Sequence, residues 1–462
     1  MGRTTLYLPA GLLVSLLMPL GSVGCTAIVD TDVGKGLGDT CSSDDDCQGA
    51  QCVDGLCAIS CAAAADCPPP SVCTSAGLCE LPLKVGFIYV GVVEDEGWTL
   101  THEEGRQVAV EQLPFLTTDF VSNVFLPDDA LQAADDFVAD GVDVVVANSF
   151  SLRGPMTTAA EKHLNTKFLT CSGNVRTANH GTYFGRMEQA YHLAGYAAAH
   201  VTTTKRLGFV GSFITPEVVR HINAFTRGAH RMDSSIVVEV RWEGFWFDLD
   251  EPNGEGKYNE TVLAEALLDG GADVIAHNMD NGRALAAVEQ RKLDTGMDLY
   301  CIGNDNYDAC DRGPTTCIGT SYWNWGPLYV NLFDQIHRNS WDPLQVINEN
   351  IRSNPEQSIP NFSVNTSVGG NDLAISVSEL LADLAKPGNE HKSFEVFGSE
   401  SEYCSTGQRE PNCIQSGEEI TDDELITMCW FVEGVVEKSD PEDPQSADVA
   451  AQVPQPECDT QQ

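Results

Sequence analysis

The sequence predicts an α/β protein with two lobes, preceded by a small disulfide-rich module. From Lys84 onward, short apolar runs alternate with amphipathic stretches of helical length, which is typical of parallel strands joined by helical crossovers. Roughly 250 residues of such units exceed one comfortable hydrophobic core, so two lobes are expected. Before Lys84 the chain is rich in cysteine and poor in large apolar side chains.

Composition excludes one class of partner. The 462 residues include 68 Asp plus Glu and 26 Lys plus Arg, which gives a formal net charge of -42. Nucleic acid is excluded as a partner, because phosphate binding needs clustered cations and the chain has no basic run. A hydrophobic content of 42% argues against a disordered chain. The acidity is therefore a property of the solvated surface, with a salt-rich habitat left open as its cause.

The first 24 residues are expected to be an export signal. Arg3 supplies the positive start, and residues 6–20 form an apolar run that is too short and too interrupted by proline for a membrane span. Small residues then precede Cys25 and resemble a bacterial lipobox, which implies a lipidated Cys25 and a membrane-anchored lipoprotein on the periplasmic or outer face of the cell envelope. Ordinary secretion stays open, because Ser22 stands where such signals usually carry leucine. Residues 25–40 are expected to be a linker.

Residues 41–80 form a cysteine-rich repeat module. Eight of the 17 cysteines fall here in two tandem units, each with an acid before its second cysteine and a glycine two before its last. Disulfides are expected to replace the core that this segment cannot build, in an oxidising compartment. Zinc is not favoured, because the spacing lacks Cys-x2-Cys pairs and the segment has no histidine. The connectivity stays open, and a stalk or docking role is expected rather than catalysis.

The remaining elements follow from periodicity and capping. Strands are expected at 85–90, 142–147, 168–171, 207–210, 236–240, 274–276 and 299–303. Helices are expected at 102–113, 130–140, 187–201, 261–269, 284–291, 324–338 and 373–384. Another helix begins at Thr215, Pro216 and Glu217, which supply a hydroxyl cap, a proline in the first turn and an early acid.

The lobes and connections are assigned from these elements. The first lobe is expected to span 84–204, with 320–350 returning to it, and the second to span 205–319 with part of 351–436. Residues 353–371 are expected to be a loop, and residues 437–462 an acidic, disordered tail.

The cysteines beyond the repeats divide into two groups. Cys171 and Cys301 lie in apolar strands and are expected to be buried thiols. The others are expected to form disulfides, as Cys310 with Cys317, Cys404 with Cys413 and, as a guess, Cys429 with Cys458.

The ligand site is expected where strands end, because open parallel sheets bind ligands at the carboxyl ends of their strands. The segments that follow predicted strands are 94–99, 148–150, 245–248, 278–281 and 304–307. No nucleophile elbow, phosphate loop, zinc-protease motif or dinucleotide fingerprint is present in the sequence. Catalytic residues, a metal and a cofactor are therefore not predicted.

Long segments carry a family resemblance. In order, these are KVGFIYVGVVEDEGWTLTHEEGR, ANSF, CSGNVRTANHGTYFGRMEQAYHLAG, TPEVVRHINAFTRGA, VRWEGFWFD, GADVIAHNMDN, YCIGNDN, SYWNWGP and ITDDELITMCWFVEGVV. Together they cover residues 84–436 and resemble the basic membrane protein (BMP) family, substrate-binding lipoproteins of ABC transporters that include the purine nucleoside receptor. The resemblance implies a type I periplasmic-binding-protein fold, in which two Rossmann-like lobes joined by three crossings close over a small ligand. It also implies an ABC permease as partner and a purine nucleoside as the leading ligand.

The resemblance also suggests site residues. Trp98 and Trp246 match the two stacking positions, and a stacked base contributes roughly 1–3 kcal/mol per aromatic face. Core packing is the alternative for either indole. The acids and polar residues of the expected ligand set are Asp95, Thr99, Asn148, Ser149, Asp248, Asp280 and Asp305. Ionised carboxylates would accept hydrogen bonds from ribose hydroxyls or a ring N–H.

Purely structural roles stay open for these polar residues. Asp280 and Asp305 could cap helices, and Asn148 and Ser149 could stabilise turns. His102 and Glu188 are weaker candidates.

Departures from the family pattern leave specificity open. Thr99 stands where the family often has asparagine, and Phe245 stands where it often has serine. Tyr307 stands where a second acid is common, and no lysine is clearly placed to hold a ribose. A ligand-gated sensor that docks on a membrane partner would use the same fold. A nucleoside hydrolase that uses carboxylates across the cleft is the less favoured alternative, because no metal cluster or activated nucleophile accompanies them.

Overall fold

The computed structural model describes residues 37–39, 41–53, 55–69, 71–74, 77–247, 252–254, 256–394 and 420–437. The predictions for the export signal, Cys25, the Cys404–Cys413 loop, Cys458 and the tail lie outside these residues, as does the one for Asp248. The chain divides into two compact units, Met1–Ser60 and Cys61–Gln462.

Each cysteine repeat folds as a short antiparallel hairpin. The first contains η1 (Asp44–Asp46), β1 (Gln51–Val53) and β2 (Leu56–Ser60), and the second contains η2 (Ala64–Asp66), β3 (Val72–Cys73) and β4 (Leu78–Glu80). Both join the first cysteine to the third and the second to the fourth, as Cys41–Cys52, Cys47–Cys57, Cys61–Cys73 and Cys67–Cys79. The repeated acids brace the turns, since Asp46 accepts the backbone N–H of Ser42 and Asp66 accepts that of Ala62. The predicted disulfide framework is confirmed.

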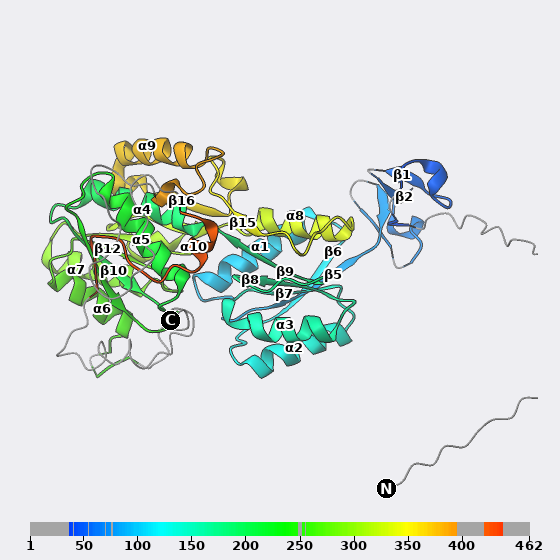
Figure 1. Cartoon of the computed structure of the whole chain (residues 1–462), viewed down its shortest axis with the longest axis horizontal. Helices are drawn as coiled ribbons and strands as arrows, with labels where there is room; N and C mark the ends of the chain where they lie inside the picture. The colour runs from blue at the N-terminus through cyan, green and yellow to red at the C-terminus, as the bar shows by residue number, and fades with distance from the viewer. Residues whose placement is uncertain are drawn as a thin grey trace, which may run out of the picture. The chain divides into compact units, whose positions relative to one another are not determined.

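The first sheet has six parallel strands in the order β15-β9-β8-β7-β5-β6. Their bounds are β5 Leu83–Ile88, β6 Leu116–Val121, β7 Val144–Ala147, β8 Lys167–Cys171, β9 His180–Gly185 and β15 Ile347–Glu349. Figure 1 shows α2 (Pro127–Ala139) and α3 (Arg153–Lys162) on one face, and α1 (Trp98–Gln112) with α8 (Gly326–His337) on the other. The order reverses between β5 and β7.

The second sheet has seven strands in the order β16-β14-β13-β12-β10-β11-β17. Their bounds are β10 Arg206–Gly211, β11 Val237–Trp242, β12 Val274–His277, β13 Tyr300–Gly303, β14 Cys317–Trp323, β16 Pro360–Val364 and β17 Val435–Glu437. All neighbours are parallel except β14 and β16. One face packs on α6 (Asn259–Asp269) and α7 (Arg283–Thr295), and the other on α4 (Met187–Val201) and α5 (Pro216–His230). The order reverses between β10 and β12.

Helices α4 and α5 cross so closely that glycine is required at two positions. A Cβ on Gly195 would lie 1.7 Å from the carbonyl oxygen of Phe225, and a Cβ on Gly228 would lie 1.9 Å from that of His192. Both distances are far below van der Waals contact, so a larger residue would push the helices apart. The predicted start of α5 is confirmed, with the Thr215 hydroxyl accepting from the N–H of Val218.

The segment after α9 (Thr366–Leu384) completes the second sheet. It contributes η6 (Lys392–Phe394), α10 (Asp422–Ile426) and strand β17, which pairs with β11. Asn223 of α5 fixes this segment by donating to the carbonyl of Trp430 at 2.8 Å and accepting from the N–H of Val432 at 3.0 Å. The family segment quoted for residues 420–436 is thus part of the fold.

Some elements differ from expectation. Strands β6, β9, β14, β15 and β17 and helices α3 and α10 were not predicted. The loop expected at 353–371 is wrong, because this segment contains η5 (Pro355–Gln357), β16 and the first turns of α9. Strand β16 is five residues long, begins at a proline and lies at the sheet edge, so its apolar signal is weak. The predicted lobe boundaries stay predictions.

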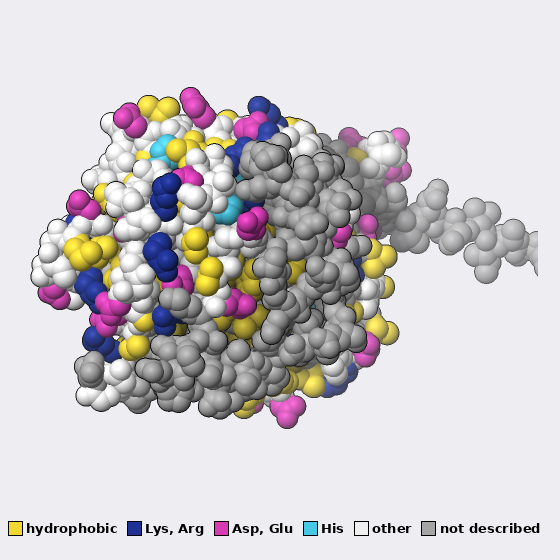
Figure 2. Space-filling model, turned by 60° about the vertical axis from the view of Figure 1, so that its left-hand side comes forward, with side chains coloured by type: hydrophobic (Ala, Val, Ile, Leu, Met, Phe, Trp, Pro, Cys, Tyr) yellow, Lys and Arg dark blue, Asp and Glu magenta, His cyan; other side chains and the backbone are white. Residues whose placement is uncertain are grey.

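The surface mixes charges. Figure 2 shows a face on which Lys and Arg side chains lie among acidic ones, so the negative net charge does not make this face uniformly acidic. Within the described part of the chain, no helix is long and apolar enough to cross a membrane.

Candidate functional site

The two points at which strand order reverses bring four loops together. In the first sheet, the loop after β5 holds Asp95 and the end of β7 leads into Asn148. In the second sheet, Ser212 follows β10 and Asp280 follows β12. Ligands of open α/β sheets bind outside the carboxyl ends of the strands at such switch points. The fold therefore places the expected site between the two sheets.

Two adjoining cavities lie between these loops. The larger has a volume of about 390 Å³ and is lined from the first sheet by Gly91, Asp95 and Phe125, and from the second by Phe247, Asp280 and Arg283. The smaller has a volume of about 280 Å³ and is lined by Leu100, Glu104, His277, Asn304, Asn306 and Asp308. Both include Glu96, Asp280, Asn281, Gly282 and Arg312 in their walls. A cleft of this size suits a small organic molecule.

The two walls of the cleft touch. A Cβ on Gly97 would lie 2.3 Å from the carbonyl oxygen of Asp280, so the backbones approach at van der Waals distance. The rings of Phe125 and Phe247 lie 5.9 Å apart, and Arg312 binds Glu96 in an ion pair. The structure therefore represents a cleft with closed walls.

Asp95 is committed to its own loop. Its carboxylate accepts the backbone N–H groups of Gly97 at 3.0 Å, Thr99 at 2.7 Å and Leu100 at 3.0 Å, which are orphan donors at the start of α1. Burial raises the pKa of Asp95, and these three bonds act in the opposite direction. The capping role that was left open for the other aspartates thus applies to Asp95.

Asp280 has a different environment. Its backbone N–H donates to the carbonyl of Trp246 at 2.9 Å, but among the described residues no group donates a hydrogen bond to its carboxylate. Burial raises the pKa of Asp280 well above the ordinary carboxyl range, and the charges of Asp305 and Asp95 raise it further. Asp280 lines both cavities, and its carboxylate has no described hydrogen-bond donor.

Asp305 lies deeper, with 5% of its surface exposed. Its carboxylate accepts from the indole N–H of Trp323 at 3.1 Å, and its φ of 62° lies in the left-handed region. Burial raises the pKa of Asp305 well above its usual range, and the charge of Asp95 raises it further. The charges of these acids therefore act on the pKa values of Asp280 and Asp305, whereas their contact with a ligand stays a prediction.

Neither predicted indole is among the residues that line the cavities. Trp98 is half-buried, donates its indole N–H to the carbonyl of Asn148 at 2.7 Å and packs edge-on against Trp323 and Trp325. Trp246 is half-buried and lies 6.2 Å from Phe213. Phe125 and Phe247 are the aromatic rings in the larger cavity. Stacking by Trp98 and Trp246 stays a prediction.

The polar residues predicted on the first wall have different environments. Ser149 caps the short turn η3 (Phe150–Leu152) by accepting the N–H of Ser151, which is the turn chemistry left open for it. Asn148 is fully buried; its Oδ1 accepts from the N–H of Val90, while its Nδ2 has no partner among the described residues. Thr99 is fully buried, and its Oγ1 also lacks a partner in the part of the chain that the structure describes.

The weaker candidates serve the scaffold. His102 stacks on Trp325 at 4.5 Å and shares a hydrogen bond of 2.6 Å with Tyr329, and burial lowers its pKa well below the usual value. Glu188 lies between Arg186 and Arg220, at 3.8 and 3.6 Å.

Sequence reasoning missed several residues near the site. Glu217 entered only as the early acid of a helix, yet it accepts from Ser172 at 3.1 Å, and burial raises its pKa. Phe247 is one residue beyond the predicted Trp246 in the GFWFD segment. Glu96 and Arg312 are missed because nothing in either local sequence indicates that they meet. Among the described residues, the trios of possible metal ligands are repeat cysteines, whose sulfurs are in disulfides.

Comparison with protein families and curated proteins gives consistent matches. The model of the Bmp family, described as ABC transporter substrate-binding protein PnrA-like, matches residues 83–352. A purine-binding protein of Brucella abortus is 30% identical over 263 residues, which cover 57% of this chain and 71% of that protein. A putative ABC transporter glucose-binding protein of Haloferax volcanii is also 30% identical over 263 residues, covering 56% of this chain and 62% of that protein. The chain therefore spans less than two thirds of the Haloferax relative.

Solved structures share the fold. An ABC transporter solute-binding protein from Conexibacter woesei superimposes with a TM-score of 0.50 at 20% identity, covering 66% of this chain and 96% of that one. A transcriptional activator of the comK gene from Bacillus halodurans gives a TM-score of 0.54 at 18% identity, covering 66% and 98%. At these identities the likeness concerns the fold alone. The predicted periplasmic-binding-protein class, with its preceding disulfide-rich module, is confirmed.

Proposed function

The chain belongs to the family of PnrA-like ABC transporter substrate-binding proteins, and we propose that it captures a purine nucleoside between its lobes for import by an ABC permease. As an ABC transporter solute-binding protein it is extracytoplasmic. The family consists of binding proteins, so the nucleoside is expected to leave the cleft unaltered.

The Asp280 carboxylate is the observation that carries the proposal. Asp280 lines both cavities, its carboxylate has no described hydrogen-bond donor, and the charges of two further acids raise its pKa. Desolvating a carboxylate without donors costs free energy, and a ligand that supplies O–H or N–H groups recovers that cost. The hydroxyls of a ribose and the ring N–H of a hypoxanthine or guanine are such donors.

Other groups of the larger cavity support a flat heterocycle. Phe125 and Phe247 present rings from opposite walls, where a base could pack against them. Trp98 and Trp246 enter the proposal as stacking residues on the strength of the family resemblance.

A binding experiment tests the proposal. Extensively dialysed protein is titrated calorimetrically with inosine, guanosine, adenosine and glucose, and each mixture is then analysed by chromatography. We expect at least one nucleoside to bind with a micromolar or lower Kd, about -8 kcal/mol, and to be recovered intact. Release of free base would assign catalysis instead, and absence of binding by every nucleoside would reject the proposal.

A hexose is the second candidate ligand. The Haloferax relative is named a putative glucose-binding protein. Carboxylates and aromatic rings of the kind found here also suit sugar hydroxyls and a sugar ring face. Binding of glucose without binding of any nucleoside would favour this candidate.

Anchoring by lipid is part of the same proposal. Cys25 follows the predicted export signal and is expected to carry the lipid that holds the protein at the membrane. Intact-mass analysis of the protein extracted from the cell envelope is expected to show an acylated N-terminal cysteine, and Cys25→Ser is expected to release the protein into the soluble fraction.

A further inference from the structure

We propose that Glu96 and Arg312 form a lock across the cleft that sets how fast a bound ligand leaves, and that the Cys310–Cys317 disulfide holds Arg312 in position for it. The identity of the test ligand rests on the proposed function, whereas the lock itself can be measured in the ligand-free protein.

The two residues come from opposite walls. Glu96 lies in the loop between β5 and α1, and Arg312 ends the short turn η4 (Ala309–Arg312) that follows β13. The Nε of Arg312 donates to Oε2 of Glu96 at 2.8 Å, and its terminal nitrogen donates to Oε1. The guanidinium thus binds both carboxylate oxygens, an arrangement that is stronger and more directional than a single contact.

The backbone at Glu96 supports a functional role. Its φ is 68°, in the left-handed region that is unfavourable for a non-glycine residue. Such conformations cluster at ligand clamps and switch regions, where the surrounding structure enforces them. Here the conformation accompanies a glutamate that meets the opposite wall.

Glu96 and Arg312 lie where the two cavities adjoin. Both residues belong to the shared wall of the two cavities, together with Asp280, Asn281 and Gly282. A ligand in either cavity therefore lies against this pair. Opening the cleft must separate Glu96 from Arg312, because each belongs to a different wall.

The strength of the pair suits repeated opening. The side chains of Arg312 and Glu96 are 51% and 50% exposed. Ion pairs in water contribute little to stability, so this one can be broken in each binding cycle. The ion pair nevertheless stabilises the closed state and not the open state, and the closed state is the one that retains the ligand.

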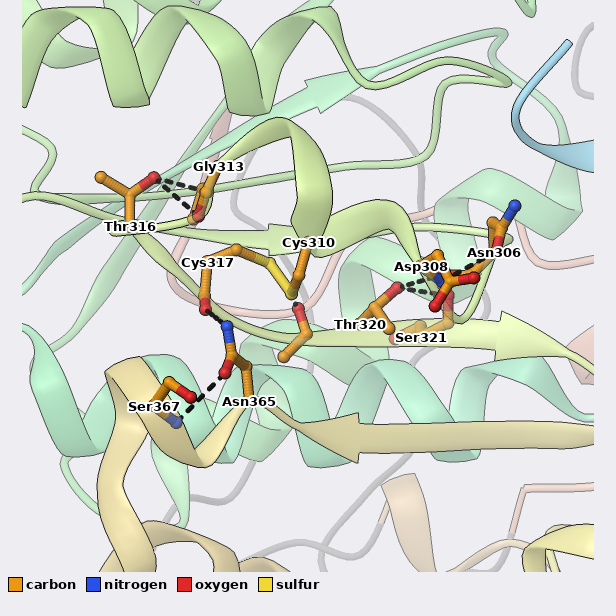
Figure 3. Close-up of a disulfide and its surroundings, with 12 residues drawn as sticks. Asn306, Asp308, Cys310, Gly313, Thr316, Cys317, Thr320, Ser321, Asn365 and Ser367 are labelled. Carbon is orange, nitrogen blue, oxygen red and sulfur yellow. Dashed lines mark hydrogen bonds between the residues drawn. A yellow bond between two sulfur atoms is a disulfide. The ribbon is translucent and has the colours of Figure 1, made fainter.

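The disulfide fixes the loop that carries Arg312. Cys310 lies in η4 and is bonded to Cys317 at the start of β14, and Figure 3 shows this link beside the hydrogen bonds of Thr316 to Gly313 and of Thr320 to Asn306. Position 282 must also be small, since a Cβ on Gly282 would lie 2.8 Å from Cγ of Arg312. The disulfide therefore ties the Arg312 loop to β14, and Gly282 leaves room for the arginine side chain.

Stopped-flow release of inosine tests the lock. We expect Glu96→Gln and Arg312→Gln each to release inosine about fivefold faster than the unaltered protein, a change of about 1 kcal/mol. The charge-swapped double variant, Glu96→Arg with Arg312→Glu, is expected to return the rate to within about twofold of the unaltered protein. The difference between variants is expected to shrink in about 1 M salt, which screens exposed charges.

Two controls accompany these variants. Arg291→Gln removes the ion pair between Arg291 of α7 and Asp269 of α6, which lies away from the cleft. This variant is expected to release inosine at the unaltered rate. Replacing both Cys310 and Cys317 by serine is expected to speed release in the same direction, provided that the melting temperature shows a folded protein. Unchanged release in Glu96→Gln and Arg312→Gln, or no recovery in the swapped variant, would overturn the proposal.

Small-angle X-ray scattering separates the lock from the choice of ligand. In the ligand-free protein, Glu96→Gln and Arg312→Gln are expected to increase the radius of gyration, and the swapped variant is expected to restore it. Failure of inosine to bind any variant, with the increase observed, would reject the nucleoside and keep the lock. An identical radius in all variants would reject the lock.

Discussion

Asp95 and Asp280 occupy comparable places, each in a loop at the switch point of its own sheet, but their carboxylates have different partners. Asp95 accepts three backbone N–H groups of its own loop, whereas among the described residues none donates to the carboxylate of Asp280. The first wall, with Ser149 capping a turn, uses most of its acceptors to hold itself together. The second wall leaves the carboxylate of Asp280 without a described donor, and we propose that the ligand supplies one. The same residue type at the end of a strand can thus belong to the scaffold or to the site.

Removing the charge of Asp280 is expected to have the largest effect on binding. Asp280→Asn is expected to weaken inosine binding about 10- to 100-fold, because hydrogen bonds to a charged group contribute roughly 1.5–3 kcal/mol. Calorimetric titration measures the change. Asp294→Asn, at an exposed position on α7, serves as the control and is expected to bind inosine normally. Equal affinity in Asp280→Asn and the control would assign ligand recognition to another acid.

A side chain placed between the two walls is expected to have the second-largest effect on inosine binding. Gly97→Ala places a Cβ against the carbonyl of Asp280, so the walls cannot approach as they do here. We expect inosine affinity to fall about tenfold, or roughly 1.4 kcal/mol. Gly154→Ala on α3 is the matched control, because its Cβ would meet nothing within 4 Å. Normal binding by Gly97→Ala would show that this contact is not needed for capture.

The reverse pattern is expected at Asp95. Asp95→Ala leaves three N–H groups of the α1 start without their acceptor, and loss of such a cap costs about 0.5–2 kcal/mol. Urea denaturation is expected to show this loss for Asp95→Ala and no loss for Asp280→Ala. If both variants were equally destabilised, the contrast between the two walls would not hold.

The smallest expected effect concerns pH. Burial, then Asp305 and Asp95, raise the pKa of Asp280 in the folded state. A carboxyl with a raised folded pKa stabilises the fold below its unfolded pKa, and this contribution is lost as the pH rises through the folded pKa. At any pH above the unfolded pKa, the raised folded pKa of Asp280 therefore lowers the stability of the fold, and Asp280→Asn removes that cost.

Urea titrations from about pH 7.5 to about pH 4.5 measure this effect. The stability advantage of Asp280→Asn is expected to be largest at neutral pH and to shrink as the carboxyl of Asp280 becomes protonated. Buried histidines such as His277, whose pKa is lowered by burial to about 3, destabilise both proteins below about pH 6.5 and cancel in the difference. A constant advantage across this range would show that Asp280 does not carry a raised pKa.

Sequence predictions succeeded where the signal lies within a few neighbouring residues and failed where it depends on distant ones. Helix α4 begins and ends where alanine-rich periodicity predicted, and Thr215 caps α5 as its sequence indicated. Strand β16 was missed because a short edge strand needs its partner β14 to be recognisable. Asp95, Asp280 and Asp305 were predicted from strand-end positions and the family resemblance, and their assignment to the ligand stays a prediction. Their roles were not found, because a role depends on which N–H groups face each carboxylate.

The sequence by itself determined the disulfide-rich repeats, the α/β pattern with many of its strands and helices, and the buried thiols of Cys171 and Cys301. These features depend on cysteine spacing, periodicity and caps, which act over a few residues. Only the tertiary structure decided that Asp280 is left without a described donor, that Phe125 meets Phe247 and that Glu96 meets Arg312. The last two residues are 216 positions apart, and their contact exists only because two separately folded sheets bring their loops face to face.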